Sequence, residues 1–413
     1  MKPEEEAKLT RTSAYISPGS LSRRVIPALI REALGRGRLT LRFKDADISV
    51  GNGPYVCTIE PPSLFRFIRL MARPDLNVPR FYVRGYWNCE MFKLYDFLFL
   101  ILGNEKSIIR RYFELLNNNN LIRDNVLYKL FPMYVNRNTA LHYSSNVDFM
   151  RIILGDTLLY TCAFFDSQNN TLDLAQRNKV LLVGTRLELN RDDQVLELGS
   201  GWGNAAEILS GHFGCHITGI NLTRKQVEYA QSRRIHDTKF ECSSFSDFSP
   251  PRTYDKIYSI GMLEHIGKGN HGGFFMKIRR LLSDTGLALI HCIVREERGS
   301  TNAWIDRTIF PGGYIPRVSE IIEAIEDANI SLVATHIHAK ENYFRTLQSW
   351  RSNFYNNEPQ LRQLLRAHLR ESEIEQAMRI WDFYFSVSQI GFSKEHGVYQ
   401  TAQFVIRKRQ QGP

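Results

Sequence analysis

The sequence lacks an uninterrupted apolar run of the roughly 20 residues that a membrane-spanning helix requires. The apolar run at residues 97–102 is far too short. The first residues, Met1-Lys-Pro-Glu-Glu-Glu6, are acidic, whereas an export signal begins with basic residues. We therefore expect a cytoplasmic protein.

Cysteine is sparse and shows no pattern. The six cysteines lie at positions 57, 89, 162, 215, 242 and 292, without paired spacing. This argues against a zinc site or a disulfide scaffold and favours a reducing compartment. His336 and His338 would share one face of a strand, but no third ligand accompanies them, so we expect no metal site.

Two common nucleotide-binding motifs are also missing. The first strand of the central region, residues 195–198, is followed by Gly199-Ser-Gly-Trp-Gly203, which lacks the spacing Gly-x-Gly-x-x-Gly of dinucleotide-binding folds. No Gly-Lys-Ser/Thr loop for a nucleoside triphosphate is present either. Glycines after a strand let the backbone approach a ligand closely, so the turn predicts a site for a mononucleoside-type cofactor.

Strand and helix patterns alternate from residue 195 onward, which predicts a doubly wound Rossmann-like α/β domain. Because ligands of such sheets collect at the carboxyl ends of the strands, we expect the functional residues there. The expected strands are residues 216–222, 239–242, 254–262 and 287–294, and the expected helices are residues 204–209, 224–234 and 274–282.

The N-terminal third is organised differently and predicts a smaller α+β domain. Residues 39–44 and 46–50 alternate like antiparallel strands, and residues 63–72 and 90–115 resemble helices. Residues 92–102 are apolar on more than one face, which favours burial over an exposed surface that contacts acyl chains. We predict domains at residues 1–116 and 141–413, joined by a linker at 117–140.

Several short motifs accompany the glycine turn. The turn resembles the S-adenosylmethionine site of class I methyltransferases, and the other motifs resemble, in the same order, those of the cyclopropane-fatty-acyl-phospholipid synthase family, which includes the mycolic acid cyclopropane synthases. These motifs are Arg84-Gly-Tyr-Trp87, His142-Tyr143, Leu159-Tyr-Thr-Cys-Ala-Phe-Phe165, Gly261-Met-Leu-Glu-His265, Ile290-His-Cys-Ile293, Ile309-Phe-Pro-Gly-Gly-Tyr-Ile-Pro316, Asn342-Tyr343 and Tyr399-Gln400.

The resemblance implies an activity. Family members transfer the methyl group of S-adenosylmethionine to a cis double bond of a phospholipid acyl chain and remove a proton to close a cyclopropane. The family's proton acceptor is a bound bicarbonate. An alkene is a weak nucleophile, so the site must align the reactants and exclude water. The residues that match the family's bicarbonate site, and are the expected catalytic residues, are Cys162, Glu264, His291, Ile293 and Tyr343.

The resemblance also implies the cofactor contacts, with one departure. The expected residues are Tyr160, Thr161, Gly199, Gly201, Gly203, Asn221, Thr223, Gln226, Ser244 and Phe245. Family members usually have an acidic residue at the position of Ser244. Its loss weakens the expected contact with the adenine amine unless Asp247 substitutes for it.

Two further departures precede the cysteine motif. Ser144 and Gly155 stand where many family members have aspartate. We interpret both positions as a rewired hydrogen-bond network, with an altered substrate preference as the alternative. Within the long segment 296–328, Trp304, Phe310 and Tyr314 are candidates to line an acyl channel.

The formal charge of +10 favours an anionic partner. The basic residues are dispersed among apolar ones and match no RNA-binding motif, which favours an anionic phospholipid surface over nucleic acid. The family carries an N-terminal lipid-binding domain, so we expect peripheral membrane association. The sequence leaves open whether a homodimer forms.

Three other functions remain open. A relative could leave a methyl or methylene branch, and an amine N-methyltransferase of the coclaurine type shares the scaffold. A non-catalytic lipid- or RNA-binding protein could use a decayed methyltransferase fold. Cys162, His291 and Tyr343 argue for the cyclopropane synthase.

Overall fold

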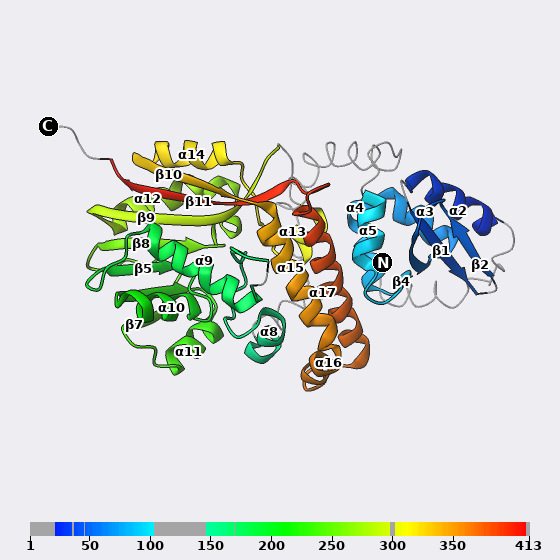
Figure 1. Cartoon of the computed structure of the whole chain (residues 1–413), viewed down its shortest axis with the longest axis horizontal. Coiled ribbons are helices and arrows are strands. Elements are labelled where there is room, and N and C mark those ends of the chain that lie inside the picture. The colour runs from blue at the N-terminus through cyan, green and yellow to red at the C-terminus, as the bar shows by residue number, and fades with distance from the viewer. Residues whose placement is uncertain are drawn as a thin grey trace, which may run out of the picture. The chain divides into compact units, whose positions relative to one another are not determined.

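A computed structural model describes residues 21–34, 37–44, 46–102, 146–168, 170–297 and 302–409. Its contacts divide the chain into two compact units, Met1–Asp124 and Asn125–Pro413 (Figure 1). The predicted linker at 117–140 lies outside the described residues, as do His142 and Ser144. None of the described helices is long and apolar enough to cross a membrane.

The N-terminal unit holds a four-stranded sheet in the order β2-β1-β3-β4. The antiparallel pair β1 and β2 matches the prediction, whereas β3, which pairs in parallel with β1, was not predicted. Its strands are β1 (Arg38–Phe43), β2 (Ala46–Val50), β3 (Tyr55–Glu60) and β4 (Asn88–Cys89), and its helices are α2 (Leu21–Ala33), α3 (Leu64–Ala72), α4 (Pro74–Val83) and α5 (Leu94–Leu102).

The core of this unit follows from strand alternation. Leu39 and Leu41 of β1 and Cys57 of β3 face Ile26 and Ile30 of α2 in one buried cluster. The helix expected at residues 90–115 begins only at α5. Phe92 has a φ of 66°, a left-handed conformation that an α-helix cannot contain, so the helix starts after it.

The C-terminal unit is built on a seven-stranded sheet in the order β10-β11-β9-β8-β5-β6-β7. The strands β5 to β9 are mutually parallel, and β11 lies antiparallel between β9 and β10. The strand bounds are β5 (Gln194–Leu198), β6 (His216–Asn221), β7 (Thr238–Cys242), β8 (Tyr254–Ile260), β9 (Leu282–Arg295), β10 (Ile330–His338) and β11 (Tyr399–Lys408).

Helices cover both faces of this sheet, as predicted for a doubly wound fold (Figure 1). One face packs on α12 and α14, the other on α9, α10 and α11. The helix bounds are α8 (Val147–Leu154), α9 (Leu172–Arg186), α10 (Asn204–Phe213), α11 (Arg224–Ser232), α12 (His271–Leu281), α13 (Ala303–Thr308), α14 (Val318–Asp327), α15 (Lys340–Asn356), α16 (Glu358–Arg366) and α17 (Glu371–Gly391), with 3₁₀ turns η2 (Leu263–His265) and η3 (Lys268–Asn270).

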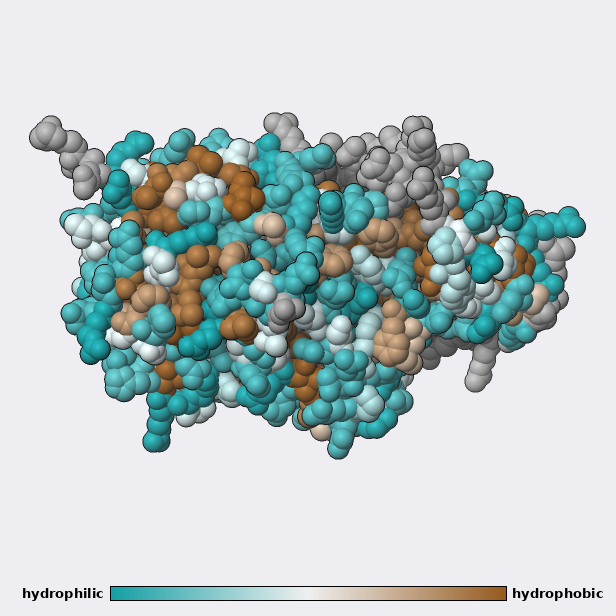
Figure 2. Space-filling model, viewed as in Figure 1, coloured by the Kyte–Doolittle hydropathy of each residue, from teal (hydrophilic) through white to brown (hydrophobic). Residues whose placement is uncertain are grey.

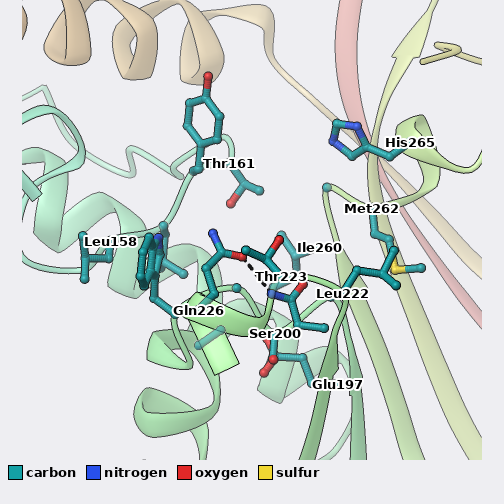
Figure 3. Close-up of a pocket in the computed structure, with 18 of the residues that line it drawn as sticks. Leu158, Thr161, Glu197, Ser200, Leu222, Thr223, Gln226, Ile260, Met262 and His265 are labelled. Carbon is teal, nitrogen blue, oxygen red and sulfur yellow. Dashed lines mark hydrogen bonds between the residues drawn. The ribbon is translucent and has the colours of Figure 1, made fainter. Parts of the chain in front are cut away.

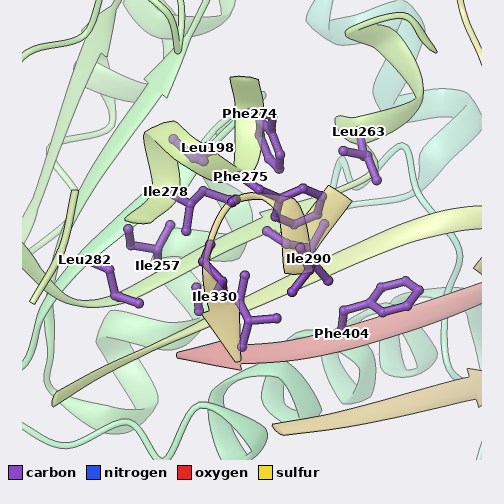
Figure 4. Close-up of a cluster of buried hydrophobic side chains, with 14 of the residues drawn as sticks. Leu198, Ile257, Leu263, Phe274, Phe275, Ile278, Leu282, Ile290, Ile330 and Phe404 are labelled. Carbon is purple, nitrogen blue, oxygen red and sulfur yellow. The ribbon is translucent and has the colours of Figure 1, made fainter. Parts of the chain in front are cut away.

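The apolar run predicted at residues 287–294 is the buried centre of β9. Figure 4 shows Ile290 packed with Phe274 and Phe275 of α12 and with Phe404 of β11. Gly286, which follows the predicted helix 274–282, lies within β9. A Cβ at Gly286 would come 2.8 Å from the Asp255 carbonyl oxygen, so glycine is required there by close backbone approach.

Strand order reverses at β5, because β6 follows it on one side and β8 lies on the other. This topological switch point is where open parallel sheets bind ligands, beyond the carboxyl ends of the strands.

Candidate active site

A cavity of about 430 Å³ opens at the switch point. Figure 3 shows Thr161, Glu197, Ser200 and Gln226 around this space. The expected cofactor residues that line it are Tyr160, Thr161, Gly199, Gly201, Asn221, Thr223, Gln226 and Phe245.

The glycine turn between β5 and α10 has left-handed backbone at each glycine. The φ angles of Gly199, Gly201 and Gly203 are 86°, 52° and 82°, which other residues adopt only with strain. A Cβ on Gly203 would meet Phe240 at 2.8 Å and Ala230 at 2.9 Å, whereas one on Gly201 would meet nothing within 4 Å. Gly203 therefore packs the turn against its neighbours and is not among the lining residues.

Asn221, at the end of β6, forms a side-chain hydrogen bond with Gln226. Asn221 Nδ2 donates to Gln226 Oε1 at 2.7 Å, the dashed line in Figure 3. Thr223 lies between them and is the N-cap residue of α11.

Ser244, the other expected residue outside the cavity wall, bonds within its own turn. Its hydroxyl donates to Asp247 Oδ2 at 2.7 Å, while Ser243 and Phe245 line the cavity.

At Gly155, where φ is 84°, a Cβ would come 2.7 Å from Asp173 Oδ1, which accepts from the Thr157 N–H at 3.0 Å. The Asp173 carboxylate of α9 thus lies beside Gly155.

Two charged residues at or beside the cavity were not singled out by the sequence analysis. Glu197 of β5 lines the cavity, and burial raises the pKa of its carboxyl to about 7. Lys179 of α9 is buried, and its Nζ donates to Thr161 Oγ1 at 2.7 Å. Burial lowers the Lys179 pKa to about 7. The available signal was a charged residue on the apolar face of a helix that also buries Ala175 and Val183.

The five expected catalytic residues are not among the cavity-lining residues that the structure describes. Four of them share one neighbourhood beside it. Burial holds the pKa of Tyr343 well above its usual value. Three nearby groups add to this effect, namely Tyr384, Cys162 and Glu264. Glu264 Oε1 accepts from the Ile293 N–H at 2.6 Å.

The Glu264 carboxyl is poised to change protonation near neutrality, since burial raises its pKa to about 7. Its second oxygen, Oε2, is buried and has no hydrogen-bond partner among the described residues. Burial also raises the pKa of the Cys162 thiol to about 12, so the thiol stays neutral. It donates to the Ala163 carbonyl oxygen at 3.2 Å.

His291 reaches the cluster from β9 and is held through β11. Arg186 Nη1 donates to Gln403 Oε1 and lies 3.2 Å from His338 Nε2. Because a guanidinium has no acceptor, the Gln403 oxygen faces Arg186 and its amide nitrogen faces His291. Gln403 Nε2 then donates to His291 Nδ1 at 3.0 Å, which leaves the ring proton on Nε2.

His291 is consequently a neutral hydrogen-bond donor. Burial holds its pKa well below the usual value, and His338, Lys179 and Arg186 lower it further. Its Nε2 is buried and, among the described residues, has no partner.

Aromatic rings connect the cavity with this cluster. The Tyr160 ring lies 5.2 Å from Trp350, which lies 6.2 Å from Tyr343. Phe310, predicted to line an acyl channel, lines the cavity. Trp304, predicted for the same role, is a core residue that packs on Phe383 at 5.0 Å. The predicted third member, Tyr314, bonds to Glu320 at 2.8 Å.

The sequence model of a family described as mycolic acid cyclopropane synthetase matches residues 134–404. The cyclopropane-fatty-acyl-phospholipid synthase of Escherichia coli (strain K12) is 25% identical over 313 residues, which cover 75% of this chain and 79% of that protein.

Solved structures show that the fold is shared. The cyclopropane synthase MmaA2 from Mycobacterium tuberculosis is 24% identical, with a TM-score of 0.59 over 67% of this chain and 98% of that one. Coclaurine N-methyltransferase bound to N-methylheliamine and SAH is 18% identical, with a TM-score of 0.62 over 83% of this chain and all of that one (100%). The chain belongs to the mycolic acid cyclopropane synthetase family and is an S-adenosylmethionine-dependent C-methyltransferase of the cyclopropane synthase type.

Proposed function

We propose that this protein transfers a methyl group from S-adenosylmethionine to a cis double bond of a phospholipid acyl chain and closes a cyclopropane, with bicarbonate as the proton acceptor. The observation that carries the proposal is the buried pair Glu264 and His291 beside the cavity, each with an unpartnered polar atom. The similarity to a cyclopropane-fatty-acyl-phospholipid synthase supports the substrate class.

The cavity fits the cofactor. Glu197 Oε2 and Ser200 Oγ line it and, among the described residues, have no hydrogen-bond partner, so they can bind the amino and hydroxyl groups of S-adenosylmethionine. When bound, the cofactor supplies an electrophilic methyl group. Lys179 and Gln176 of α9 fix the adjoining wall, since both bond to Thr161, at 2.7 Å and 2.8 Å.

The cluster fits a small oxyanion. His291 Nε2 is buried without a partner among the described residues and can donate to such an ion, as can the neutral Tyr343 hydroxyl. Bicarbonate, when bound, supplies a base in a site that excludes water. The Ile293 N–H donates to Glu264 Oε1 and so orients that carboxyl. Glu264 Oε2 remains available to accept or orient a proton.

The aromatic side chains have a separate task. A methylated alkene is a carbocation that water would quench, and aromatic faces stabilise cations without attacking them. Tyr160 has the Trp350 ring at 5.2 Å and the Phe310 ring at 6.4 Å, on the path from the cavity to Tyr343. These rings suit an alkene substrate.

The proposal is tested by incubating the protein with labelled S-adenosylmethionine and vesicles of an unsaturated phospholipid, followed by mass spectrometry of the acyl chains. We expect chains that gain one CH₂ unit and resist ozonolysis, because the double bond is gone. A product that gains CH₂ but is cleaved by ozone is a methylene-branched chain, and it would contradict ring closure.

The amine N-methyltransferase that the sequence analysis left open has only the shared fold in its support. The same labelled cofactor, offered with heterocyclic amines, distinguishes the two. Transfer to amines without transfer to vesicles would refute the lipid substrate.

We also propose that the protein works in the cytoplasm at an anionic membrane surface, which it contacts through α3. Phe65 and Ile68 share one helical face and are 70% and 61% exposed, beside the exposed Arg66 and Arg69. Figure 2 shows hydrophobic patches within a mostly hydrophilic surface. Replacing both apolar residues by serine should weaken sedimentation with phosphatidylglycerol vesicles about tenfold or more. Unchanged sedimentation would exclude this face.

A further inference from the structure

Arg295, the last residue of β9, carries a buried charge without an acidic partner in the part of the chain that the structure describes. The residue is 8% exposed, and its Nε and Nη1 have no hydrogen-bond acceptor among the described residues. The Tyr399 ring centre lies 5.9 Å from its guanidinium carbon, and Tyr314 is also close enough for Arg295 to lower the pKa of its hydroxyl. An unpaired buried guanidinium is strongly destabilising. Arg295 therefore lowers the stability of the folded protein.

The position of Arg295 relates it to the candidate active site. Alternate side chains of a strand share one face, so Arg295, Ile293 and His291 lie along the same face of β9. Their partners on β11 are Tyr399, Thr401 and Gln403. At roughly 3.3 Å per residue, Arg295 lies about 13 Å along the strand from His291. It is therefore too far away to bind the same small ion as His291.

Further positive charge lies next to Arg295. Its N–H donates to the Pro316 carbonyl oxygen at 3.0 Å, and its backbone forms a bridge with Arg317. Arg317 and the exposed Lys268 both approach Glu320, at 3.6 Å and 3.7 Å. The Glu320 carboxylate thus pairs with both Lys268 and Arg317. No carboxylate of the described residues pairs with Arg295.

We propose that Arg295 binds an oxyanion of the lipid substrate while the double bond lies near His291 and Glu264. The inference rests on the proposed function and adds to it where the charged end of the substrate binds. A guanidinium matches the paired oxygens of a phosphodiester or a carboxylate. An acyl chain separates these groups from its double bond, as the strand separates Arg295 from His291.

The test replaces Arg295 by methionine, which keeps much of the side-chain volume and removes the charge. With dioleoyl-phosphatidylglycerol vesicles, KM should rise about 10- to 100-fold, as for loss of a charged hydrogen bond, with kcat unchanged. Without lipid, the melting temperature of Arg295→Met should rise, because an unpaired buried charge is gone. Arg379→Met is the matched control: Arg379 has a 20% exposed side chain and pairs with Glu375 at 2.7 Å. It should lower the melting temperature and leave KM unchanged.

The source of the oxyanion follows from parallel assays with free oleate. A KM defect confined to vesicles identifies the phosphodiester, and one confined to oleate identifies the carboxylate. An unchanged KM with both substrates overturns the inference, as does a loss of kcat alone. Inorganic phosphate provides an arm independent of turnover: it should raise the melting temperature of wild type and not that of Arg295→Met. If wild type methylates neither lipid but phosphate still discriminates the two proteins, the proposed function fails and the oxyanion site stands.

Discussion

Replacing Gln403 by glutamate would test whether the ring proton of His291 lies on Nε2. In the wild type the Gln403 amide donates to His291 Nδ1, and Arg186 fixes that amide by donating to its oxygen. A carboxylate keeps the bond to Arg186 but can only accept from the ring. The proton then moves to Nδ1, and Nε2 turns from a donor into an acceptor facing the candidate oxyanion.

Loss of one preorganised donor to a bound anion lowers kcat about 10²- to 10³-fold, and we expect this loss for Gln403→Glu. Cofactor binding should persist, because neither residue lines the cavity. The ¹⁵N spectrum of histidine-labelled protein reports the tautomer directly: His291 Nδ1 should lack a proton in wild type and carry one in the variant.

Gln403→Leu is the control, since it removes the amide without supplying an acceptor. His291 can then keep its Nε2 proton, and the kcat of this variant should fall less than that of Gln403→Glu. Equal losses in the two variants would refute the tautomer argument, as would a wild-type spectrum with a protonated Nδ1.

Three further expectations concern the same unit. Glu264→Gln and Tyr343→Phe should each retain cofactor binding, measured by calorimetry, and lose turnover; parallel loss of both would assign these residues a structural role. Because the folded-state pKa of Glu264 is about 7, against an ordinary value of 4.5, the folded protein holds this proton longer than the unfolded chain. Wild-type stability should therefore fall by about 3 kcal/mol relative to Glu264→Gln as pH rises from 4.5 through 7, measured by urea unfolding at each pH. A constant difference would contradict the raised pKa. Gly203→Ala should lower the free energy of unfolding by about 2 kcal/mol or more through its left-handed backbone and contact with Phe240. Gly201→Ala should be less destabilising, since open space surrounds its Cβ; the reverse order would be inconsistent with the packing described.

Local chemistry explains what the sequence could predict. The glycine turn could be predicted because a backbone with positive φ favours glycine. The centre of β9 could be predicted because a strand buried on both faces is a continuous apolar run. Asn221 ends β6 and Phe245 follows β7, so both line the cavity at the carboxyl edge of the sheet. Thr161 lines the cavity from a loop that faces this edge.

The contacts that the sequence analysis did not predict join residues that are distant in the chain. The contact between Gln403 and His291 exists because β11 inserts antiparallel between β9 and β10, and the periodicity of a strand does not encode its neighbours. Lys179 was missed because its role follows from a segment 18 residues away in the chain, at Thr161. The strand β3 was not predicted; it begins directly after Gly51-Asn-Gly-Pro54, a sequence typical of a turn.

The central position of β11 in the sheet has a consequence for biosynthesis. The cavity is formed by residues that all precede this strand, whereas the partner that orients His291 arrives with it. A chain still emerging from the ribosome could fold its cofactor pocket well before β11 can insert beside β9. Until β11 pairs with β9, His291 lacks the amide that orients its ring, so efficient turnover should begin only when the sheet is complete.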